Sequence, residues 1–244
     1  MWEHKKVAAY TGTRNLYPLM IPAVKSLVTN SDVDEIWLFI EDDDFLDGYI
    51  FPKDLVKIRN VSQQGYFKPD GPNMKSHFTY MAMMRATYAK EFPELDRILS
   101  LDVDTIVNDD ISELWDLPLK DEYYFAASME PSTTNRRGYL YTNIGVCLYN
   151  LEKLRDGKCD EVIDALNTKK YTFMEQDAFN ELCQGKIFDM NPTYNSNVFT
   201  KVVDLPKIVH YAGEKKWDGK ILVKKYGEQS WKETLKWRER RYRK

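Results

Sequence analysis

The fold is expected to form around residues 97–107, which read Arg-Ile-Leu-Ser-Leu-Asp-Val-Asp-Thr-Ile-Val. This short run of apolar and β-branched residues, followed by turn-forming residues at 108–110, is typical of a buried strand. Two aspartates nevertheless stand near its carboxyl end. Because residues two apart on a strand face the same side, Asp102 and Asp104 are predicted to converge on one point.

Two converging carboxylates repel each other unless a shared proton or a cation lies between them. A hard divalent cation with oxygen ligands satisfies the pair most simply. The alternative is a pair of solvated acids in a surface turn. The apolar strand in front of the pair weakens that alternative, because ligand sites in open α/β sheets lie at the carboxyl ends of the strands.

The composition predicts a single globular domain. With 244 residues, 43% of them hydrophobic and 14% aromatic, the chain has ample material for a packed core. It shows no segment of signal-peptide form and no apolar run approaching the ~18 residues that span a bilayer. Its cysteines, Cys147, Cys159 and Cys183, lack metal-ligand spacing and are expected to be reduced thiols, which predicts a cytoplasmic protein.

Charge is distributed unevenly along the chain. The net charge is −3, but residues 215–244 hold twelve Lys and Arg against four Asp and Glu, a net of +8. The remaining 214 residues therefore carry −11. An acidic body with a basic end argues against a general nucleic-acid-binding protein and predicts a tail directed at a local partner.

Strand-like and helix-like segments alternate, which is typical of an α/β domain with a mainly parallel sheet. Strands are expected at 7–10, 35–40, 55–61, 97–107, 124–127 and 142–150. Helices are expected at 16–27, at 76–90, as a short turn at 111–115, and from 151 onward. The acidic run at 41–44 is expected to be a solvated loop, and 135–138 a polar loop. We predict one domain over residues 1–220 and a basic, aromatic tail at 221–244.

Several of these stretches, taken in order, resemble glycosyltransferase family 8, a family of retaining GT-A enzymes that use a nucleotide sugar. The likeness is carried by six blocks: Val7 to Tyr17, Ser76 to Arg85, Leu99 to Thr105, Tyr141 to Val146, Glu175 to Asn180 and His210 to Trp217. The Asp-x-Asp pair alone is a weak signal, whereas the ordered set is specific. The resemblance implies a GT-A, Rossmann-like domain with a mixed, mainly parallel sheet.

The resemblance also implies a metal site made by Asp102, Asp104 and His210. The ion would bridge the two phosphates of the nucleotide as a Lewis acid and a template. A nitrogen ligand favours Mn²⁺, with Mg²⁺ as the alternative. A lone histidine is often only structural, but His210 lies between an apolar run and Gly213. Lys216 is expected to reach the same phosphates, and Gly213 would let the backbone approach them.

The nucleoside is expected against the end of the first strand. By the resemblance, Ala8, Tyr10 and Thr11 line this part of the site, with Arg14 beside them and Val103 joining from the Asp-x-Asp segment. The family often has an acidic residue where Tyr10 stands. Recognition of the base or the ribose is therefore expected to differ in this chain.

The resemblance places the donor sugar against Asn143 and Gly145, with Arg85 as a second phosphate or sugar contact. Gln176 would lie beneath the anomeric carbon, and Glu175 and Asp177 would hold sugar hydroxyls. The chain has Glu-Gln-Asp here where the family commonly shows Asp-Gln-Asp, and Trp217 where a proline usually follows the lysine. Front-face displacement is expected, although a double displacement through Glu175 or Asp177 stays open.

The end of the chain has two interpretations. Residues 231–244 mix aromatic side chains with Lys and Arg. They predict either an interfacial segment that brings the protein to the anionic inner face of a membrane, or a helix packed on the domain with a solvated charged face.

We therefore predict a metal-dependent, retaining hexosyltransferase. It would move glucose or galactose from a UDP-sugar to a glycan or glycoconjugate, with a free glycan, a lipid-linked sugar or a protein as acceptor. Two other classes remain. A haloacid-dehalogenase-type phosphatase would use Asp102 as nucleophile and Asp104 as acid/base, although those motifs usually open the chain. A non-catalytic nucleotide-sugar-binding module would keep the same residues without turnover.

Overall fold

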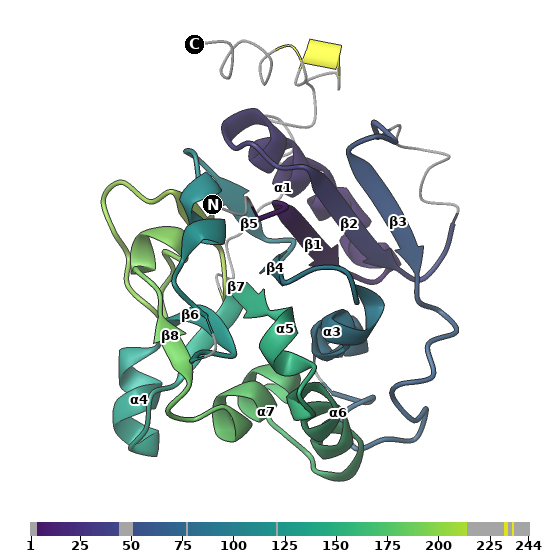
Figure 1. Cartoon of the computed structure of the whole chain (residues 1–244), viewed down its shortest axis with the longest axis vertical. Coiled ribbons are helices and arrows are strands. Elements are labelled where there is room, and N and C mark those ends of the chain that lie inside the picture. Colours follow the sequence, from purple (N-terminus) through teal and green to yellow (C-terminus); the bar gives the residue numbers. More distant parts are fainter. Residues whose placement is uncertain are drawn as a thin grey trace.

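A seven-stranded mixed sheet forms the centre of the molecule (Figure 1). The computed structural model describes residues 4–43, 51–76, 78–120 and 122–213, together with Lys232, Glu233 and Lys236. The strands lie in the order β3-β2-β1-β4-β7-β6-β8. They are β1 (Val7–Thr11), β2 (Glu35–Ile40), β3 (Val56–Asn60), β4 (Arg97–Leu101), β6 (Phe125–Met129), β7 (Thr142–Asn150) and β8 (Ile187–Asp189).

Strand β7 runs against its neighbours β4 and β6, whereas the other pairings in this sheet are parallel. The predicted α/β class and mainly parallel sheet are confirmed. Parallel pairing brings the carboxyl ends of β1, β2 and β4 to one edge, where ligand sites of open α/β sheets are found.

The predicted strand at 97–107 is in fact two strands. β4 ends at Leu101, and β5 (Thr105–Val107) pairs in a separate small sheet with β9 (Ile208–His210). The break is a turn in which the carbonyl oxygen of Asp102 accepts from the backbone N–H of Thr105 at 3.2 Å and from its hydroxyl at 2.7 Å. Asp102 and Asp104 therefore lie in a turn between strands, and the argument from same-side strand positions was wrong.

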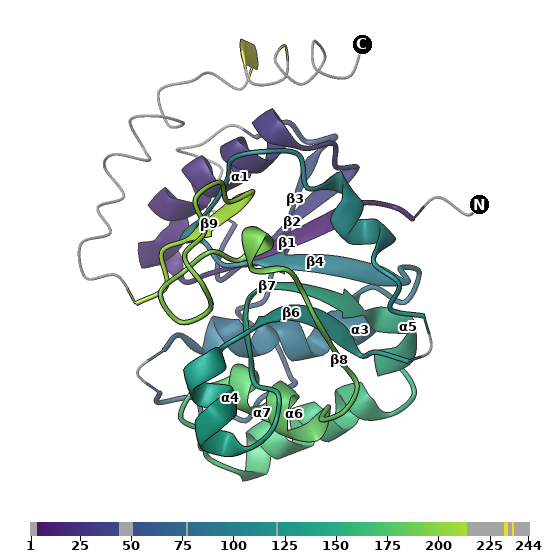
Figure 2. The same ribbon diagram turned by 90° about the vertical axis from the view of Figure 1, so that its left-hand side faces the viewer.

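Helices cover both faces of the sheet (Figure 2). One face carries α1 (Tyr17–Asn30), and the other carries α3 (Tyr88–Glu91), α6 (Lys158–Thr168) and α7 (Met174–Leu182). The sheet has a hydrophobic core on each face, and successive side chains of β1 point into opposite cores. Ala8 and Tyr10 pack on the α1 side, whereas Val7 and Ala9 pack on the other side. The indole N–H of buried Trp115 donates to the Val7 carbonyl at 3.3 Å.

The remaining elements are short. They are the helices α4 (Pro131–Arg137) and α5 (Leu151–Leu154) and the 3-10 turns η1 (Arg14–Leu16), η2 (Tyr80–Thr87), η3 (Ser112–Asp116) and η4 (Pro192–Tyr194). The helix predicted at 76–90 begins only at Tyr80, because Thr79 caps it by accepting from the N–H of Met81. The polar loop predicted at 135–138 was wrong: α4 runs to Arg137 and ends at Gly138, whose φ is 77°.

Two further observations concern the class of protein. All three cysteines are free and buried, as expected for reduced thiols. Within the part of the chain that the structure describes, no helix has both the length and the apolar character to cross a bilayer. The predicted domain boundary at residue 220 falls outside the described residues and stays a prediction.

Candidate metal and nucleotide-sugar site

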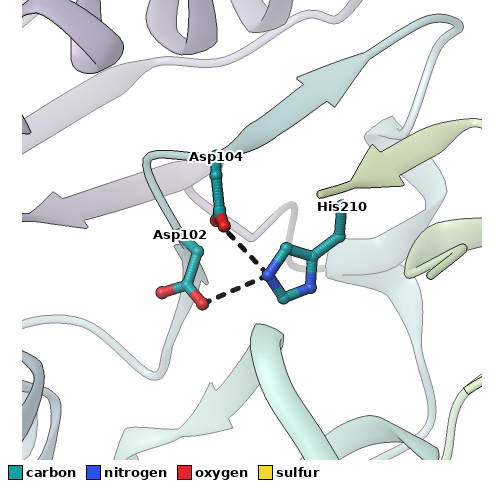
Figure 3. Close-up of side chains that lie close together, drawn as sticks. All are labelled: Asp102, Asp104 and His210. Atoms are coloured by element: carbon teal, nitrogen blue, oxygen red, sulfur yellow. Dashed lines mark ion pairs between the residues drawn. The ribbon is translucent and has the colours of Figure 1, made fainter. Parts of the chain in front are cut away.

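The three predicted metal ligands converge (Figure 3). The Nε2 atom of His210 lies 3.4 Å from Oδ2 of Asp102 and 3.3 Å from Oδ1 of Asp104. One ligand atom from each residue falls within 4.8 Å of the other two. The pairing of β5 with β9 causes this meeting, because it sets Thr105 opposite His210 and so brings the end of the described chain against the Asp-x-Asp turn.

The charges of this cluster are mutually stabilising. His210 is only 3% exposed, and although burial lowers the pKa of its imidazole, the carboxylates of Asp104 and Asp102 raise it to about 9. Burial likewise raises the pKa of Asp102, but the Arg85 guanidinium and His210 outweigh it and lower the value to about 2. Protein charges alone hold the two acids together through a protonated histidine. A divalent cation would take the place of that proton.

The donor set fits a divalent transition-metal ion. Two carboxylates and one imidazole nitrogen suit Mn²⁺ among other ions. His210 is also oriented as metal ligands usually are, because its Nδ1 lies 2.8 Å from Oδ1 of Asn195. That oxygen only accepts, so Nδ1 carries a hydrogen, and Nε2 is the atom that faces the two acids and would offer its lone pair to a cation once its own proton has left.

Arg85 supports the cluster through an ion pair with Asp102. Its side chain is 5% exposed and donates to Oδ1 of Asp102, while its second nitrogen lies 3.4 Å from Oε1 of Glu175 and 3.3 Å from the Ile144 carbonyl. The guanidinium of Arg85 is therefore already paired with two carboxylates of the protein, those of Asp102 and Glu175. The predicted contact of Arg85 with phosphate or sugar is untested, and the geometry makes the residue a support for Asp102.

A second polar network lies beside the metal cluster, around Gln176. Its amide nitrogen donates to the Tyr141 hydroxyl at 3.1 Å and to Oε1 of Glu130 at 3.3 Å, and its amide oxygen accepts from the Ile144 N–H. Asn143 donates to the same Glu130 oxygen at 3.0 Å. Gln176 and Asn143 were predicted sugar-site residues, and the structure brings them together.

Glu130 is the site residue that sequence reasoning missed. It is 7% exposed, and a buried carboxylate needs partners of this kind. Its position in the sequence could have indicated a site residue, because it directly follows β6 and precedes Pro131. The end of β6 lies at the same edge of the sheet as the Asp-x-Asp turn, with β7 between them.

Asp177 is occupied by structural contacts. Its Oδ1 accepts from Arg137 at 2.7 Å and from the Tyr141 hydroxyl at 2.8 Å, while its Oδ2 accepts from the Phe173 N–H at 2.9 Å. With all of these partners and 3% exposure, Asp177 fixes the start of α7 and the position of Tyr141. The predicted role in holding sugar hydroxyls stays a prediction.

The predicted nucleoside residues lie at the ends of β1 and η1. Ala8 and Tyr10 are fully buried, and the Tyr10 hydroxyl donates to the Ala23 carbonyl at 3.4 Å, so their side chains belong to the core. Thr11 is 6% exposed. Arg14 pairs with Asp42 at 3.0 Å.

Two acids of the run predicted to be a solvated loop, Glu41 and Asp42, have side-chain partners. Glu41 accepts from the Tyr80 hydroxyl and Asp42 from the Tyr17 hydroxyl, each at 3.1 Å. These acids at the end of β2 are therefore held in place beside Arg14.

Three predicted nucleotide contacts remain, Val103 at the nucleoside and Gly213 and Lys216 at the phosphates. Val103, in the turn itself, is 9% exposed. Gly213 has a φ of 71°, which favours glycine, and a Cβ there would come within 2.7 Å of the Phe199 ring. Lys216 lies outside the described residues.

A comparison with known families decides the relationship. The model of the family described as "Glycosyl transferase family 8" matches residues 9–220. The chain belongs to glycosyl transferase family 8. The predicted resemblance is thus confirmed, and the phosphatase alternative loses its basis, since Asp102 is paired with Arg85 and His210 in a fold of another family.

Two curated proteins are related in sequence to this family 8 chain. It is 28% identical over 178 residues to a Haemophilus influenzae protein named "Putative glycosyltransferase", which covers 61% of this chain and 52% of that protein. The chain thus spans about half the length of this relative. It is 24% identical over 237 residues to general stress protein A of Bacillus subtilis, covering 79% of this chain and 80% of the other.

Solved structures show the same GT-A fold. The galactosyltransferase LgtC, crystallised with donor and acceptor sugar analogs, superposes with a TM-score of 0.69 at 17% identity, over 94% of this chain and 100% of that one. The glycosyltransferase GlyE of Streptococcus pneumoniae gives a TM-score of 0.69 at 20% identity, over 96% of this chain and 62% of that one. At these identities the likeness extends to the fold alone.

In this family 8 protein, Gly145 lies against two of the three candidate metal ligands, Asp102 and His210. A Cβ built there would collide with the His210 ring and would come within 2.6 Å of Oδ2 of Asp102. Gly145→Ala is therefore expected to displace one of these ligands and to weaken Mn²⁺ binding about 10–100-fold, measured by calorimetric titration. Gly65→Ala is the control, because nothing lies within 4 Å of a Cβ at that position. Equal affinity in both variants would contradict the inferred ligand geometry.

Glu175 gives the site a pH-dependent stability. Burial raises the pKa of its carboxyl from 4.5 to about 7, although Arg85 opposes the shift. Since the folded value lies above the unfolded one, this contribution to stability is complete below about pH 4.5 and is lost as pH rises through 7. Relative to Glu175→Gln, the wild type should lose about 2 kcal/mol of unfolding free energy between about pH 5 and pH 7. Urea denaturation across this range measures it, and parallel curves for the two proteins would contradict it.

Proposed function

We propose that the protein transfers a hexose, glucose or galactose, from a UDP-sugar to a glycan or glycoconjugate, with a divalent metal and with retention of anomeric configuration. The observation that carries this proposal is the convergence of Asp102, Asp104 and His210 at a sheet edge beside the network of Glu130, Asn143 and Gln176. The first group has the chemistry to hold a metal diphosphate, and the second has the chemistry to hold hydroxyls.

The bound cation would neutralise the charge that develops on the nucleotide diphosphate as the anomeric bond breaks. The chain's own groups prepare the site for it. Asn195 orients His210, and Arg85 holds Asp102, so that two of the ligands are aligned before any donor arrives. Preorganised groups stabilise a transition state without the cost of reorganising during the reaction.

The neighbourhood of Gln176 supports front-face displacement over a double displacement. An amide is a poor nucleophile, and the carboxylates of Glu175 and Asp177 are both engaged by protein groups. In a front-face mechanism the departing phosphate takes the proton of the acceptor hydroxyl, and Gln176 needs only to position the sugar.

Donor binding tests the proposal. UDP-glucose and UDP-galactose, each with Mn²⁺ or Mg²⁺, are added to the full chain, and the shift of the unfolding midpoint is recorded. One donor is expected to stabilise the protein in the presence of metal and to be hydrolysed slowly without acceptor. Absence of both binding and hydrolysis with every UDP-sugar would overturn the proposal. Binding without hydrolysis or transfer would assign the chain to the non-catalytic class.

We also propose that the basic tail contacts an anionic membrane and so brings the protein to a lipid-linked acceptor. The net charge of +8 over residues 215–244 and the tryptophans within it support this proposal. A chain that ends at residue 229 is expected to sediment less with vesicles containing phosphatidylglycerol than the full chain does. Equal sedimentation would favour a tail packed on the domain.

A further inference from the structure

The segment 198–205, which we name the apolar loop, exposes large hydrophobic side chains in a row. Val198 is 59% exposed, Phe199 47%, Val202 71% and Leu205 89%. Six large hydrophobic side chains are exposed among the described residues, and four of them lie in this loop. Scattered exposed hydrophobic residues are ordinary, whereas a contiguous group marks an interaction surface.

Hydrogen bonds between polar side chains and the backbone hold the loop in shape. The Asn197 side-chain oxygen accepts from the N–H groups of Phe199 and Thr200, at 2.8 and 3.1 Å. The Ser196 hydroxyl accepts from the N–H of Val203 at 3.1 Å, and the Thr200 hydroxyl donates to the Asn195 carbonyl. The polar side chains thus satisfy the backbone inside the loop, and the apolar ones are left to face outward.

The apolar loop is also tied to the metal site. Asn195 contacts Nδ1 of His210 at 2.8 Å, and Asn197 lies 3.5 Å from the same atom. The segment leads directly into β9, which carries His210 (Figure 2). Whatever binds the apolar loop is therefore held close to the site of the chemistry.

The charge of the adjoining chain identifies the partner. The ring of Phe199 lies against Gly213, where the described main chain ends, and the residues that follow at 215–244 carry a net charge of +8. A second copy that met this one loop to loop would bring the two basic segments that follow the loops together, which costs free energy. A surface that is apolar where the loop meets it and anionic around it fits both features, and this is the chemistry of an anionic bilayer.

We propose that the apolar loop inserts into the surface of an anionic membrane and is the second anchor of the protein beside its basic tail. Stable attachment commonly requires two weak signals, such as a hydrophobic group and a polybasic segment. The loop supplies the first and the tail the second. This assignment goes beyond the proposed reaction and does not depend on the donor, because membrane binding needs neither metal nor sugar nucleotide.

Vesicle sedimentation of the full chain tests the loop. The vesicles are phosphatidylcholine alone or phosphatidylcholine mixed with phosphatidylglycerol. The wild type is expected to bind the mixed vesicles, and Val202→Ser/Leu205→Ser to bind them about tenfold more weakly or less, because the lost apolar contact is not replaced. Both side chains are highly exposed, so the unfolding midpoint should be unchanged.

A matched pair of variants separates hydrophobic contact from charge. Val202→Asp/Leu205→Asp and Ser62→Asp/Gln63→Asp add the same charge, the latter at exposed positions just after β3 at the other end of the sheet. Only the first is expected to abolish vesicle binding. Equal binding by wild type and Val202→Ser/Leu205→Ser, or no binding by the wild type, would overturn the proposal. A concentration-dependent dimer that the serine variant dissolves, without vesicle binding, would assign the loop to a second copy.

Discussion

Asp104→Ala is expected to lower metal-dependent hydrolysis of the preferred UDP-sugar by at least about a thousandfold. The variant keeps Asp102 and His210 but loses one of the three ligand groups, and the remaining pair already shares its charge with Arg85. A cation held by only one carboxylate and one imidazole would bind weakly. The rate of UDP release at saturating Mn²⁺ measures the loss of hydrolysis. A separate titration measures the loss of Mn²⁺ affinity.

The control for this experiment is Asp116→Ala, an exposed acid at the end of η3. It should hydrolyse the donor at the wild-type rate. The fold of Asp104→Ala should be intact, because Asp104 lies in a turn and is partly exposed. A variant with full activity, or with unchanged Mn²⁺ affinity, would show that the three residues form an ion-pair cluster and hold no metal.

Arg85→Met is expected to destabilise the protein by about 3–5 kcal/mol. The guanidinium is 5% exposed and lies between Asp102 and Glu175, so its removal leaves Asp102 with only His210 as counter-charge and takes the neighbouring cation from Glu175. A loss of this size is a large share of the 5–15 kcal/mol that stabilises an ordinary domain. Urea denaturation near neutral pH measures it.

Three further variants isolate the cause. Arg85→Lys should lose less stability than Arg85→Met, because it keeps the positive charge. It should still lose some, because an ammonium group cannot pair with both acids as the planar guanidinium does. Glu175→Gln placed in the Arg85→Met background should recover part of the loss above pH 7, where the buried carboxyl of Glu175, whose pKa is already about 7 beside Arg85, costs stability. Lys90→Met, at a side chain that is 38% exposed and paired with Asp160, itself 62% exposed, should cost less than about 1 kcal/mol. Equal losses for Arg85→Met and Lys90→Met would contradict the account of a buried ion cluster.

Sequence patterns predicted the parts of the structure that depend on local order. The apolar runs of β1 and β2 and the helical periodicity of α1 are local features, and each element formed where it was expected. The meeting of Asp102, Asp104 and His210 was also predicted, through the resemblance to the family, and the metal that they would hold stays a prediction.

The division of the predicted strand at 97–107 and the omission of Glu130 both come from long-range pairing. Thr105, Ile106 and Val107 continue the strand-forming run of β4, but they pair with β9 and leave the main sheet. Nothing in the local sequence of those residues indicates that they pair with a strand so far along the chain. Glu130 was missed for the same reason, since its role depends on Asn143 and Gln176, which the sheet and α7 bring to it.

The ladder between β5 and β9 also has a consequence for the order of assembly. His210 reaches the acids only after almost all of the described chain has been made, and closing so long a loop costs entropy that the short ladder and the contacts around it must offset. An ion that binds all three ligands would favour the closed form by mass action. Adding a divalent cation to the folded protein is therefore expected to raise its resistance to proteases, apart from any part the ion takes in turnover.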